Sequence, residues 1–548
     1  MEMFAEMDAV TQVPAPINEP VLDYAPGSPE RAELEVALAE LGSRRIELPH
    51  TIGGKRVTGT GKKIHVRQPH AHNLVLGTMR NATVAEAEAA VAAATAAAPA
   101  WRALSFDDRA AILLKAADLL AGPWRARIVV ATMLGQSKTC YQGEIDAACE
   151  LIDFWRFNVH FARQILAEQP GANAKGIWNR TDYRPLEGFV YAITPFNFTA
   201  IAGNLPTAPA LMGNTVIWKP SPTQQLAAQL TMELLEEAGM PPGVINMVTG
   251  DGINVSKVAL SSPDLAGIHF TGSTPTFQYL WQQVGANLAK YRTYPRLVGE
   301  TGGKDFILAH PTADPDVVRT AMIRGAFEYQ GQKCSAASRA YVPRSLWRVI
   351  KADLVQITDG LRQGDVTDLS NFVGAVIDER AFAKHREAID KAHATKGVKV
   401  VAGGTYDDSV GYFVRPTILE IDDPDHEAFS TEYFGPILAV HVYADGQYDK
   451  VLDQMESVAP FALTGSIIAQ DRAVIADAQE RLRFAAGNFY INDKPTGAVV
   501  GQQPFGGGRG SGTNDKAGAP QNLMRWTSAR SIKETFVPAK THEYPHMG

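Results

Sequence analysis

Cysteine is scarce in this chain, with three residues, Cys140, Cys149 and Cys334, among 548. Three cysteines without a repeated spacing cannot form the disulfide framework of a small secreted domain. They also lack the paired spacing of a structural zinc site, so we expect no metal. The sequence therefore predicts a protein of a reducing compartment, the cytoplasm.

An excess of positive charge is missing as well. The 52 Lys and Arg residues are outnumbered by 59 Asp and Glu residues, which gives a net charge of −7. This balance provides no basic field to hold a nucleic acid or an anionic membrane surface. No apolar run reaches the roughly 18 residues of a membrane-spanning helix. The first 30 residues carry several acidic side chains and prolines, unlike secretory and transit peptides.

Glycine-rich phosphate-binding fingerprints are missing, although the chain has 47 glycines. No G-x-G-x-x-G follows the first predicted Rossmann-like strand. The segment 299–304 is one residue short of P-loop spacing, and Asp305 stands where a P-loop has Ser or Thr. The glycines of 506–512 also miss the dinucleotide spacing. A bound nucleotide must therefore be held by other means.

Alternating strands and helices begin at about residue 186. An amphipathic helix over 223–240 ends at Gly239 and Pro241 and lies among short β-rich runs. These runs are 188–196, 214–221, 243–250 and 267–273. Such repetition predicts a parallel, doubly wound sheet, and a second α/β stretch covers about 300–485. The expected fold class is α/β, with two doubly wound parallel-sheet domains and a small β oligomerisation element.

Three helices are predicted between about residues 83 and 166, the second opened by Ser105 with Asp108 and closed by Gly122. Thr83 and Glu86 form a capping box that opens an Ala-rich helix, which we expect to end before Pro99. A further helix runs from about Glu144 to Leu166 and carries acidic residues among apolar ones. The simplest interpretation of these acids is a solvated helix face.

Two short segments carry the candidate reactive groups. LVGETGGKD offers the carboxylate of Glu300 among glycines, and EYQGQKCSAASR, 34 residues later, offers the thiol of Cys334. A thiolate can attack a carbonyl and form a thioester. A separate general base must then activate water to release the acyl group. A lone cysteine is more commonly a buried, unreactive residue, so the flanking sequence decides between the two interpretations.

Six motifs follow one another along the chain. They are TPFNF (194–198), WKPS (218–221), FTGST (270–274), ETGGK (300–304), GQKCSAASR (331–339) and EYFGP (432–436). Their wording, order and spacing resemble the NAD(P)-dependent aldehyde dehydrogenase superfamily, over residues from about 60 to 520. The resemblance implies that Cys334 is the nucleophile, that the Asn197 amide helps to hold the oxyanion, and that Glu300 is the base. Relatives that pass the acyl group to coenzyme A do not need this carboxylate, so Glu300 favours hydrolysis.

The same resemblance implies a nicotinamide cofactor. The matching residues are Thr194, Lys219, Gly272, Ser273, Thr274, Pro275, Thr276, Glu432 and Phe434. Ser273 stands between a strand and a helix, so the helix N-terminus can face the pyrophosphate without a Gly-rich loop. Many NAD-using relatives carry Glu three positions after the lysine, where this chain has Pro222. NAD is the expected cofactor, and NADP is the alternative.

The stretch 492–520 resembles the substrate-anchoring region of the Δ1-pyrroline-5-carboxylate dehydrogenase branch of the family. A turn at Gly497 and Ala498 can present backbone N–H groups to a substrate carboxylate. Ser335 can add a hydroxyl, and Phe505 and Phe198 would line the aliphatic stem. Relatives often have Ser at the position of Ala498, and Glu150 has a weaker match to an acidic residue near the substrate.

The resemblance implies NAD-dependent oxidation of L-glutamate γ-semialdehyde, which arises from Δ1-pyrroline-5-carboxylate, to L-glutamate, the second step of proline breakdown. The alternatives are another semialdehyde dehydrogenase of the family, acting for example on succinate semialdehyde, and a non-catalytic protein that retains the fold. A homodimer or larger homo-oligomer and a transient proline dehydrogenase partner are also expected.

The expected domains follow the motifs along the chain. They are an N-terminal arm (1–50), a cofactor-binding domain (51–171 and 188–297), a catalytic domain (298–495), a substrate-anchor loop with its return segment (496–520), and an oligomerisation hairpin with a C-terminal strand (172–187 and 521–548).

Overall fold

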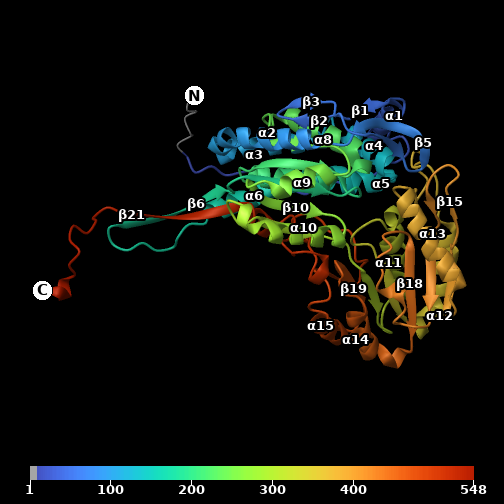
Figure 1. The fold of residues 1–548 in the computed structure, drawn as a ribbon. Coiled ribbons are helices and arrows are strands. Elements are labelled where there is room, and N and C mark those ends of the chain that lie inside the picture. Colours follow the sequence, from blue (N-terminus) through green and yellow to red (C-terminus); the bar gives the residue numbers. More distant parts are fainter. Residues whose placement is uncertain (1–8) are drawn as a thin grey trace.

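The computed structural model describes residues 9–548 and contains two seven-stranded sheets in separate lobes (Figure 1). The first sheet is parallel from β11 to β9 and has two antiparallel strands at its other edge. Its spatial order is β11 (Arg296–Glu300), β10 (Leu265–Thr271), β7 (Phe189–Thr194), β8 (Thr215–Pro220), β9 (Ile245–Met247), β2 (His50–Ile52) and β3 (Lys55–Val57).

The second sheet is parallel except for the edge strand β14. Its order is β14 (Val398–Ala402), β17 (Thr417–Ile421), β18 (Ile437–Tyr443), β13 (Arg339–Pro343), β12 (Phe306–Ala309), β19 (Thr464–Ile468) and β20 (Asn488–Ile491). The predicted fold class is confirmed, with the addition of these antiparallel edges.

Helices cover both faces of each sheet, as expected for doubly wound lobes. One face of the first sheet packs against α2 (Val84–Ala103), α9 (Ile253–Ser261) and α10 (Thr274–Asn287). The core on its other face includes α1 (Pro29–Gly42), α3 (Phe106–Ala121), α4 (Arg125–Gln136), α6 (Glu150–Ala167), α7 (Thr199–Leu211) and α8 (Gln225–Ala238). The second sheet lies between α11 (Pro315–Phe327) and α12 (Arg344–Gly360) on one side and α13 (Glu379–Ala394), α14 (Tyr448–Val458) and α15 (Arg472–Arg481) on the other.

Smaller elements complete the fold. A three-stranded sheet contains β1 (Ile46–Glu47), β4 (Lys63–Gln68) and β5 (Ala71–Arg80), and a two-stranded one contains β15 (Tyr406–Asp407) and β16 (Phe413–Val414). Short helices are α5 (Cys140–Gly143) and α16 (Pro520–Met524). No helix in the described part of the chain is long and apolar enough to cross a membrane.

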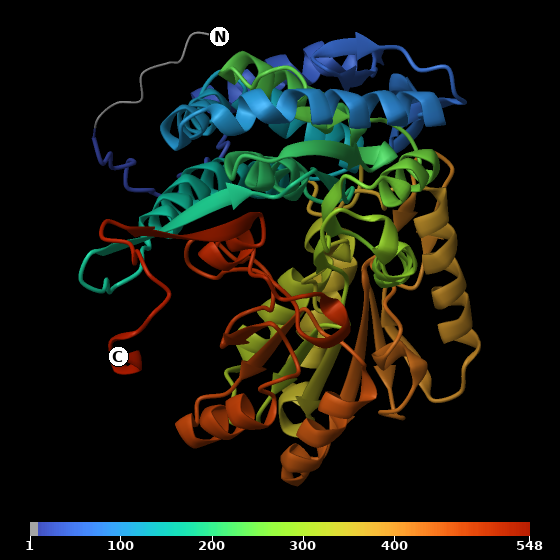
Figure 2. The same cartoon turned by 60° about the vertical axis from the view of Figure 1, so that its left-hand side comes forward.

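A two-stranded ribbon projects from the first lobe (Figures 1 and 2). It pairs β6 (Ile177–Pro185) antiparallel with β21 (Thr527–Thr535) over nine residue pairs. The sequence predicts a hairpin within 172–187, but this segment supplies one strand only. The second strand of the ribbon is the C-terminal strand β21, which pairs with β6 along its full length.

Two expectations about the helical region are corrected. Helix α2 opens with the predicted capping box but runs through Pro99 to Ala103. A tertiary contact supports this last turn, since the buried Trp101 donates from Nε1 to the carbonyl of Ala210 at 2.9 Å.

The acids of the helix predicted over about 144–166 do not form a solvated face. Glu144, Asp146 and Asp153 are buried, and a π-helical turn (Glu144–Cys149) precedes α6. Each acid has a polar partner, as buried carboxylates require. Lys138 pairs with Asp146 at 2.5 Å, and Glu144 accepts hydrogen bonds from the Arg125 guanidinium and from the N-terminal arm. The first eight residues of the predicted arm lie outside the described residues.

Candidate active site

The predicted site residues gather where the two lobes face each other. Strands β7, β10 and β11 are neighbours in the first sheet and run in parallel, so their carboxyl ends lie at one edge. Asn197 and Ser273 follow β7 and β10, and Glu300 ends β11. Cys334 precedes β13 and Glu432 precedes β18, at the amino edge of the second sheet. The site therefore combines the carboxyl edge of one sheet with the amino edge of the other.

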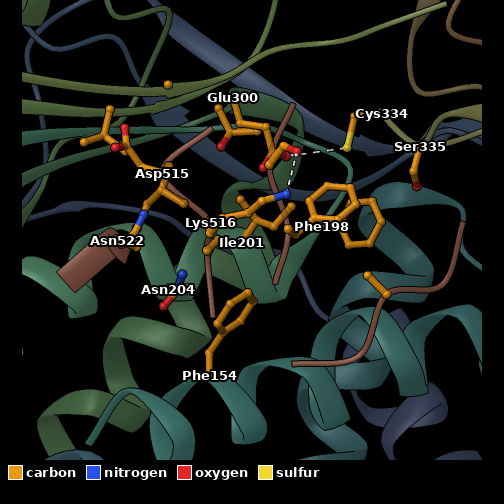
Figure 3. A pocket seen from close by; sticks show the side chains of 18 of the residues that line it. Phe154, Phe198, Ile201, Asn204, Glu300, Cys334, Ser335, Asp515, Lys516 and Asn522 are labelled. Atoms are coloured by element: carbon orange, nitrogen blue, oxygen red, sulfur yellow. Dashed lines mark hydrogen bonds between the residues drawn. The ribbon is translucent and has the colours of Figure 1, made fainter. Parts of the chain in front are cut away.

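The thiol of Cys334 lies beside the carboxylate of Glu300 (Figure 3). Its Sγ donates to Glu300 Oε1 across 3.7 Å, and the cysteine is 7% exposed. The chain before the cysteine adopts the left-handed conformation at Tyr329 (φ 50°) and Gln330 (φ 54°). The Gln330 amide bonds to the carbonyl of Ala375 at 2.7 Å, which fixes this unusual backbone. The chain leading to Cys334 is thus tied to the segment around Ala375.

Burial shifts the pKa values of both groups. Burial raises the pKa of Glu300 to about 7, against the lowering effects of its hydrogen bond to Cys334 and of the Lys516 ammonium. Burial also raises the pKa of the Cys334 thiol well above its usual range, and the Glu300 carboxylate adds to this rise. A carboxylate with a pKa near neutrality is suited to accept and return a proton at physiological pH. The thiol therefore remains protonated until a base accepts its proton, and Glu300 Oε1 is within reach.

The Asn197 amide lies in the same region. It is 3% exposed, and its Nδ2 donates to the carbonyl of Gln332, two residues before the nucleophile, at 3.0 Å. An amide nitrogen carries two N–H groups, so a second donor remains beyond the one bound to Gln332. Such a fixed donor can stabilise negative charge that develops on a carbonyl oxygen.

A small cavity of about 70 Å³ lies on one side of the Cys334–Glu300 pair. All five predicted substrate residues line it: Ser335, Gly497, Ala498, Phe505 and Phe198. The Ser335 hydroxyl is hydrogen bonded to the Thr496 hydroxyl at 2.7 Å, which joins the nucleophile segment to the predicted anchor loop. The structure thus brings together segments that are more than 160 residues apart in the chain.

Several other lining residues did not follow from the sequence. Phe154 on α6 and Ile201 and Asn204 on α7 line the cavity, together with Lys516 in the return segment (Figure 3). Glu150, the weaker match named from the sequence, lies one turn before Phe154 and also lines the cavity. The available signal was Asn204, the one amide side chain on a helix whose other polar residues are Thr199 and Thr207. Helix periodicity alone does not distinguish core from cavity.

A larger cavity of about 700 Å³ lies on the other side of Cys334, which lines both cavities. Seven of the predicted cofactor residues line it: Thr194, Lys219, Gly272, Ser273, Thr276, Glu432 and Phe434. The structure does not bring Thr274 or Pro275 to this cavity. Both lie in the first turn of α10, and the Thr274 hydroxyl donates to Thr301 at 3.0 Å.

The chemistry of the larger cavity fits a dinucleotide. The N-terminus of α10 carries no side-chain cap, so its N–H groups can face an anion. Burial lowers the pKa of Lys219 to about 8, and Asp251 opposes this shift. Glu432 Oε1 accepts from the N–H of Gly303 at 3.0 Å, which leaves the other oxygen for a hydroxyl group. A Cβ on Gly302 would lie 1.8 Å from Glu432 Oε1, so only glycine permits this approach.

Comparisons with known proteins give the same assignment. The sequence model of the aldehyde dehydrogenase family matches residues 57–532. The chain is 50% identical to the mitochondrial Δ1-pyrroline-5-carboxylate dehydrogenase of Bos taurus over 97% of this chain and 94% of that relative. It is 48% identical to a probable Δ1-pyrroline-5-carboxylate dehydrogenase of Schizosaccharomyces pombe over the full length of both.

A solved structure is also similar. The crystal structure of the Mycobacterium tuberculosis Δ-pyrroline-5-carboxylate dehydrogenase bound with NAD superimposes with a TM-score of 0.96. The two chains are 66% identical, over 99% of this chain and 100% of the other. These matches span nearly the whole chain and confirm the resemblance that the motifs indicate. The chain therefore belongs to the aldehyde dehydrogenase family.

Proposed function

We propose that the protein oxidises L-glutamate γ-semialdehyde, formed from Δ1-pyrroline-5-carboxylate, to L-glutamate with NAD. The observation that carries this proposal is the position of Cys334, which lines both the small and the large cavity. An aldehyde in the small cavity and a dinucleotide in the large one would meet at this sulfur. The relatives named above, one of which has been solved with NAD, support both the substrate and the cofactor.

The first step is the attack of the Cys334 sulfur on the aldehyde carbon. Glu300 Oε1, 3.7 Å from Sγ, is placed to accept the thiol proton, which compensates for the raised thiol pKa. The free N–H of the Asn197 amide and the backbone N–H of Cys334 donate to the resulting oxyanion. The oxidised nicotinamide, when bound, supplies the acceptor for the hydride of this adduct. Lys219, the N-terminus of α10 and Glu432 would hold that cofactor.

Release of the product requires water. Once its hydride has left, the adduct is a thioester on Cys334, and Glu300 releases the thiol proton to solvent. The carboxylate then takes a proton from a water molecule, whose oxygen attacks the thioester carbonyl, and the carbon–sulfur bond breaks. The thiolate then regains its proton. Because burial brings the pKa of Glu300 to about 7, the carboxylate can take up and release this proton near neutral pH. This sequence ends in a free acid and favours hydrolysis over acyl transfer.

The small cavity supports an amino-acid aldehyde as the substrate. The loop at Gly497 and Ala498 offers backbone N–H groups for a carboxylate, and Gly497 has φ of +102°, a conformation that favours glycine. Glu150 also lines the cavity, and burial raises its pKa well above the usual range. An ammonium group bound beside it would favour its charged form. Phe198 and Phe505 lie where an aliphatic stem would pass. A carboxylate at one end and an ammonium beside it are both present in glutamate semialdehyde.

The ribbon of β6 and β21 supports a homo-oligomer. Its outer edges present unpaired backbone groups, and exposed apolar side chains such as Trp178 (48% exposed) lie on it. We propose a homodimer or larger assembly through this ribbon, and a cytoplasmic location. A transient proline dehydrogenase partner would supply the substrate, since that class of enzyme generates pyrroline-5-carboxylate.

The experiment is a substrate panel followed by NADH absorbance at 340 nm. Purified protein is assayed with pyrroline-5-carboxylate and with succinate semialdehyde, each with NAD and with NADP, and with Cys334→Ala as the blank. The proposal expects turnover on pyrroline-5-carboxylate with NAD, lost in the variant. Turnover on succinate semialdehyde alone would overturn the substrate assignment, and no turnover on either would favour a non-catalytic protein.

A further inference from the structure

We propose that Asn18, in the N-terminal arm, is a positioning residue for the substrate-binding loop and thereby sets the affinity for the substrate. The inference rests on the proposed function and gives the arm a part in it. Within 496–520, the anchor loop itself is residues 496–508, which bring Gly497, Ala498 and Phe505 to the small cavity. Asn18 lies outside that cavity, so its effect must pass through the loop.

The side chain of Asn18 bridges two elements that both reach the cavity. Its Nδ2 donates to the carbonyl of Val500 at 2.8 Å and to Asp153 Oδ2 at 2.7 Å. Its Oδ1 accepts from Gln502 Nε2 at 3.0 Å. Asp153 precedes Phe154, and Val500 lies two residues after Ala498, so both partners are close in sequence to residues that line the cavity.

The arm is itself firmly held at this point, which a positioning role requires. The backbone N–H of Glu19 donates to Asp153 Oδ1 at 2.7 Å. The Glu19 carboxylate pairs with Arg125 at 2.5 Å and with Arg156 at 2.7 Å. A few residues later, the Tyr24 hydroxyl donates to the buried Glu144 at 2.7 Å. Helix α6 and the arm thus form one framework against which the loop can be fixed.

Hydrogen bonds hold both ends of the loop, from Thr496 to Ser335 and between the backbones of Phe505 and Ala517. Over its middle, residues 498–503 of the described structure, the hydrogen bonds that leave the loop are those with Asn18. Gly501, with φ of +81°, packs so closely on α6 that a Cβ would lie 2.1 Å from Phe157 Cε1. This close contact requires glycine at position 501, but it does not fix the orientation of the loop.

The Asn18 amide supplies a directed hydrogen bond to the carbonyl of Val500, whose side chain is buried while its neighbours 499 and 501–503 are exposed. Without this hydrogen bond, we expect the backbone N–H groups at 497 and 498 to lose their fixed orientation toward the cavity. The geometry of the Cys334–Glu300 pair should not change.

The test compares Asn18→Ala with Thr11→Val. Thr11 is a matched control, because its hydroxyl ties the same arm to Asp107 at 2.6 Å without reaching the loop. We expect Asn18→Ala to raise KM for pyrroline-5-carboxylate roughly 3- to 10-fold, the range for one lost hydrogen bond. KM for NAD and kcat should stay near wild type, and Thr11→Val should leave all three unchanged. An unchanged substrate KM in Asn18→Ala would overturn the proposal, and wild-type turnover keeps that result distinct from a failure of the proposed function.

A paired swap separates positioning of the loop from stability of the arm. In Asn18→Asp with Asp153→Asn, the amide at 153 can donate to the carboxylate at 18 and still accept from Glu19 N–H. The carbonyl of Val500 then faces a carboxylate and has no donor. We expect the swap to restore the melting temperature lost in Asn18→Asp alone, with the substrate KM still raised. Recovery of both together would show that Asn18 acts on stability only and would contradict the proposal.

Discussion

Replacing Glu300 by glutamine removes the candidate base with little change in shape. The wild-type carboxyl has a pKa of about 7, raised by burial, so its basic form is lost as the pH falls through 7. For a single group with that pKa, the basic fraction falls roughly tenfold between pH 8 and pH 6. Wild-type hydrolysis of the thioester should fall by the same factor. In Glu300→Gln it should be roughly 10²- to 10⁴-fold slower and should lose this inflection.

The assay is rapid mixing of enzyme, NAD and pyrroline-5-carboxylate, followed at 340 nm between pH 6 and pH 8. The variant should form about one NADH per active site, more slowly than wild type because the thiol has lost its base, and then enter a far slower phase because release is blocked. Acylation remains possible because the glutamine also removes the carboxylate charge that adds to the raised thiol pKa. Glu432→Gln is the matched control, since it removes a second carboxylate, one that lines the larger cavity together with Cys334. It should keep linear turnover and raise KM for NAD. Wild-type linear turnover in Glu300→Gln would refute the assignment of the base.

Four further predictions follow from the geometry. Asn197→Ala should lower kcat roughly 10²- to 10³-fold, measured at saturating substrate, because an oxyanion donor is lost. Lys219→Met should raise KM for NAD roughly tenfold with the melting temperature unchanged, as expected for one charge-assisted hydrogen bond. Gly302→Ala should also raise KM for NAD, because its Cβ would displace the Glu432 carboxylate. Truncation after Trp526 removes β21 and should shift the protein to monomer in analytical ultracentrifugation.

The fold could be predicted well from the sequence because its signals are local. The strand-helix alternation after residue 186 follows from hydrophobic periodicity, and the helix start at Ser273 follows from the FTGST motif. Both are present in the structure. The end of α2 could not be predicted in this way. Pro99 is a local stop signal, but the contact of Trp101 with Ala210, more than 100 residues away, overrides it. Tertiary packing therefore decided this boundary.

The candidate site, too, could be predicted only where its signals are local in the sequence. Motif wording located Cys334, Glu300 and Asn197, and the structure places all three around one point. For the acids between about 144 and 166, the sequence favours a solvated helix face, because an acidic residue on a helix is usually exposed. Asp153, within α6, is buried instead. Burial of Asp153 depends on the arm, which folds back over α6 from more than 130 residues away. The residue pattern of α6 does not indicate that contact. The proposed role of Asn18 could not be predicted either, because its partners are also far away in the sequence.

The central claim is that glutamate semialdehyde is oxidised through a thioester on Cys334. The most direct measurement is peptide mass spectrometry of Glu300→Gln quenched during turnover of pyrroline-5-carboxylate with NAD. The account predicts that the peptide carrying Cys334 gains the mass of one glutamyl group, and that hydroxylamine removes it. An unmodified Cys334 peptide in an enzyme that has formed one NADH per site would contradict the account, as would an adduct on Cys140 or Cys149.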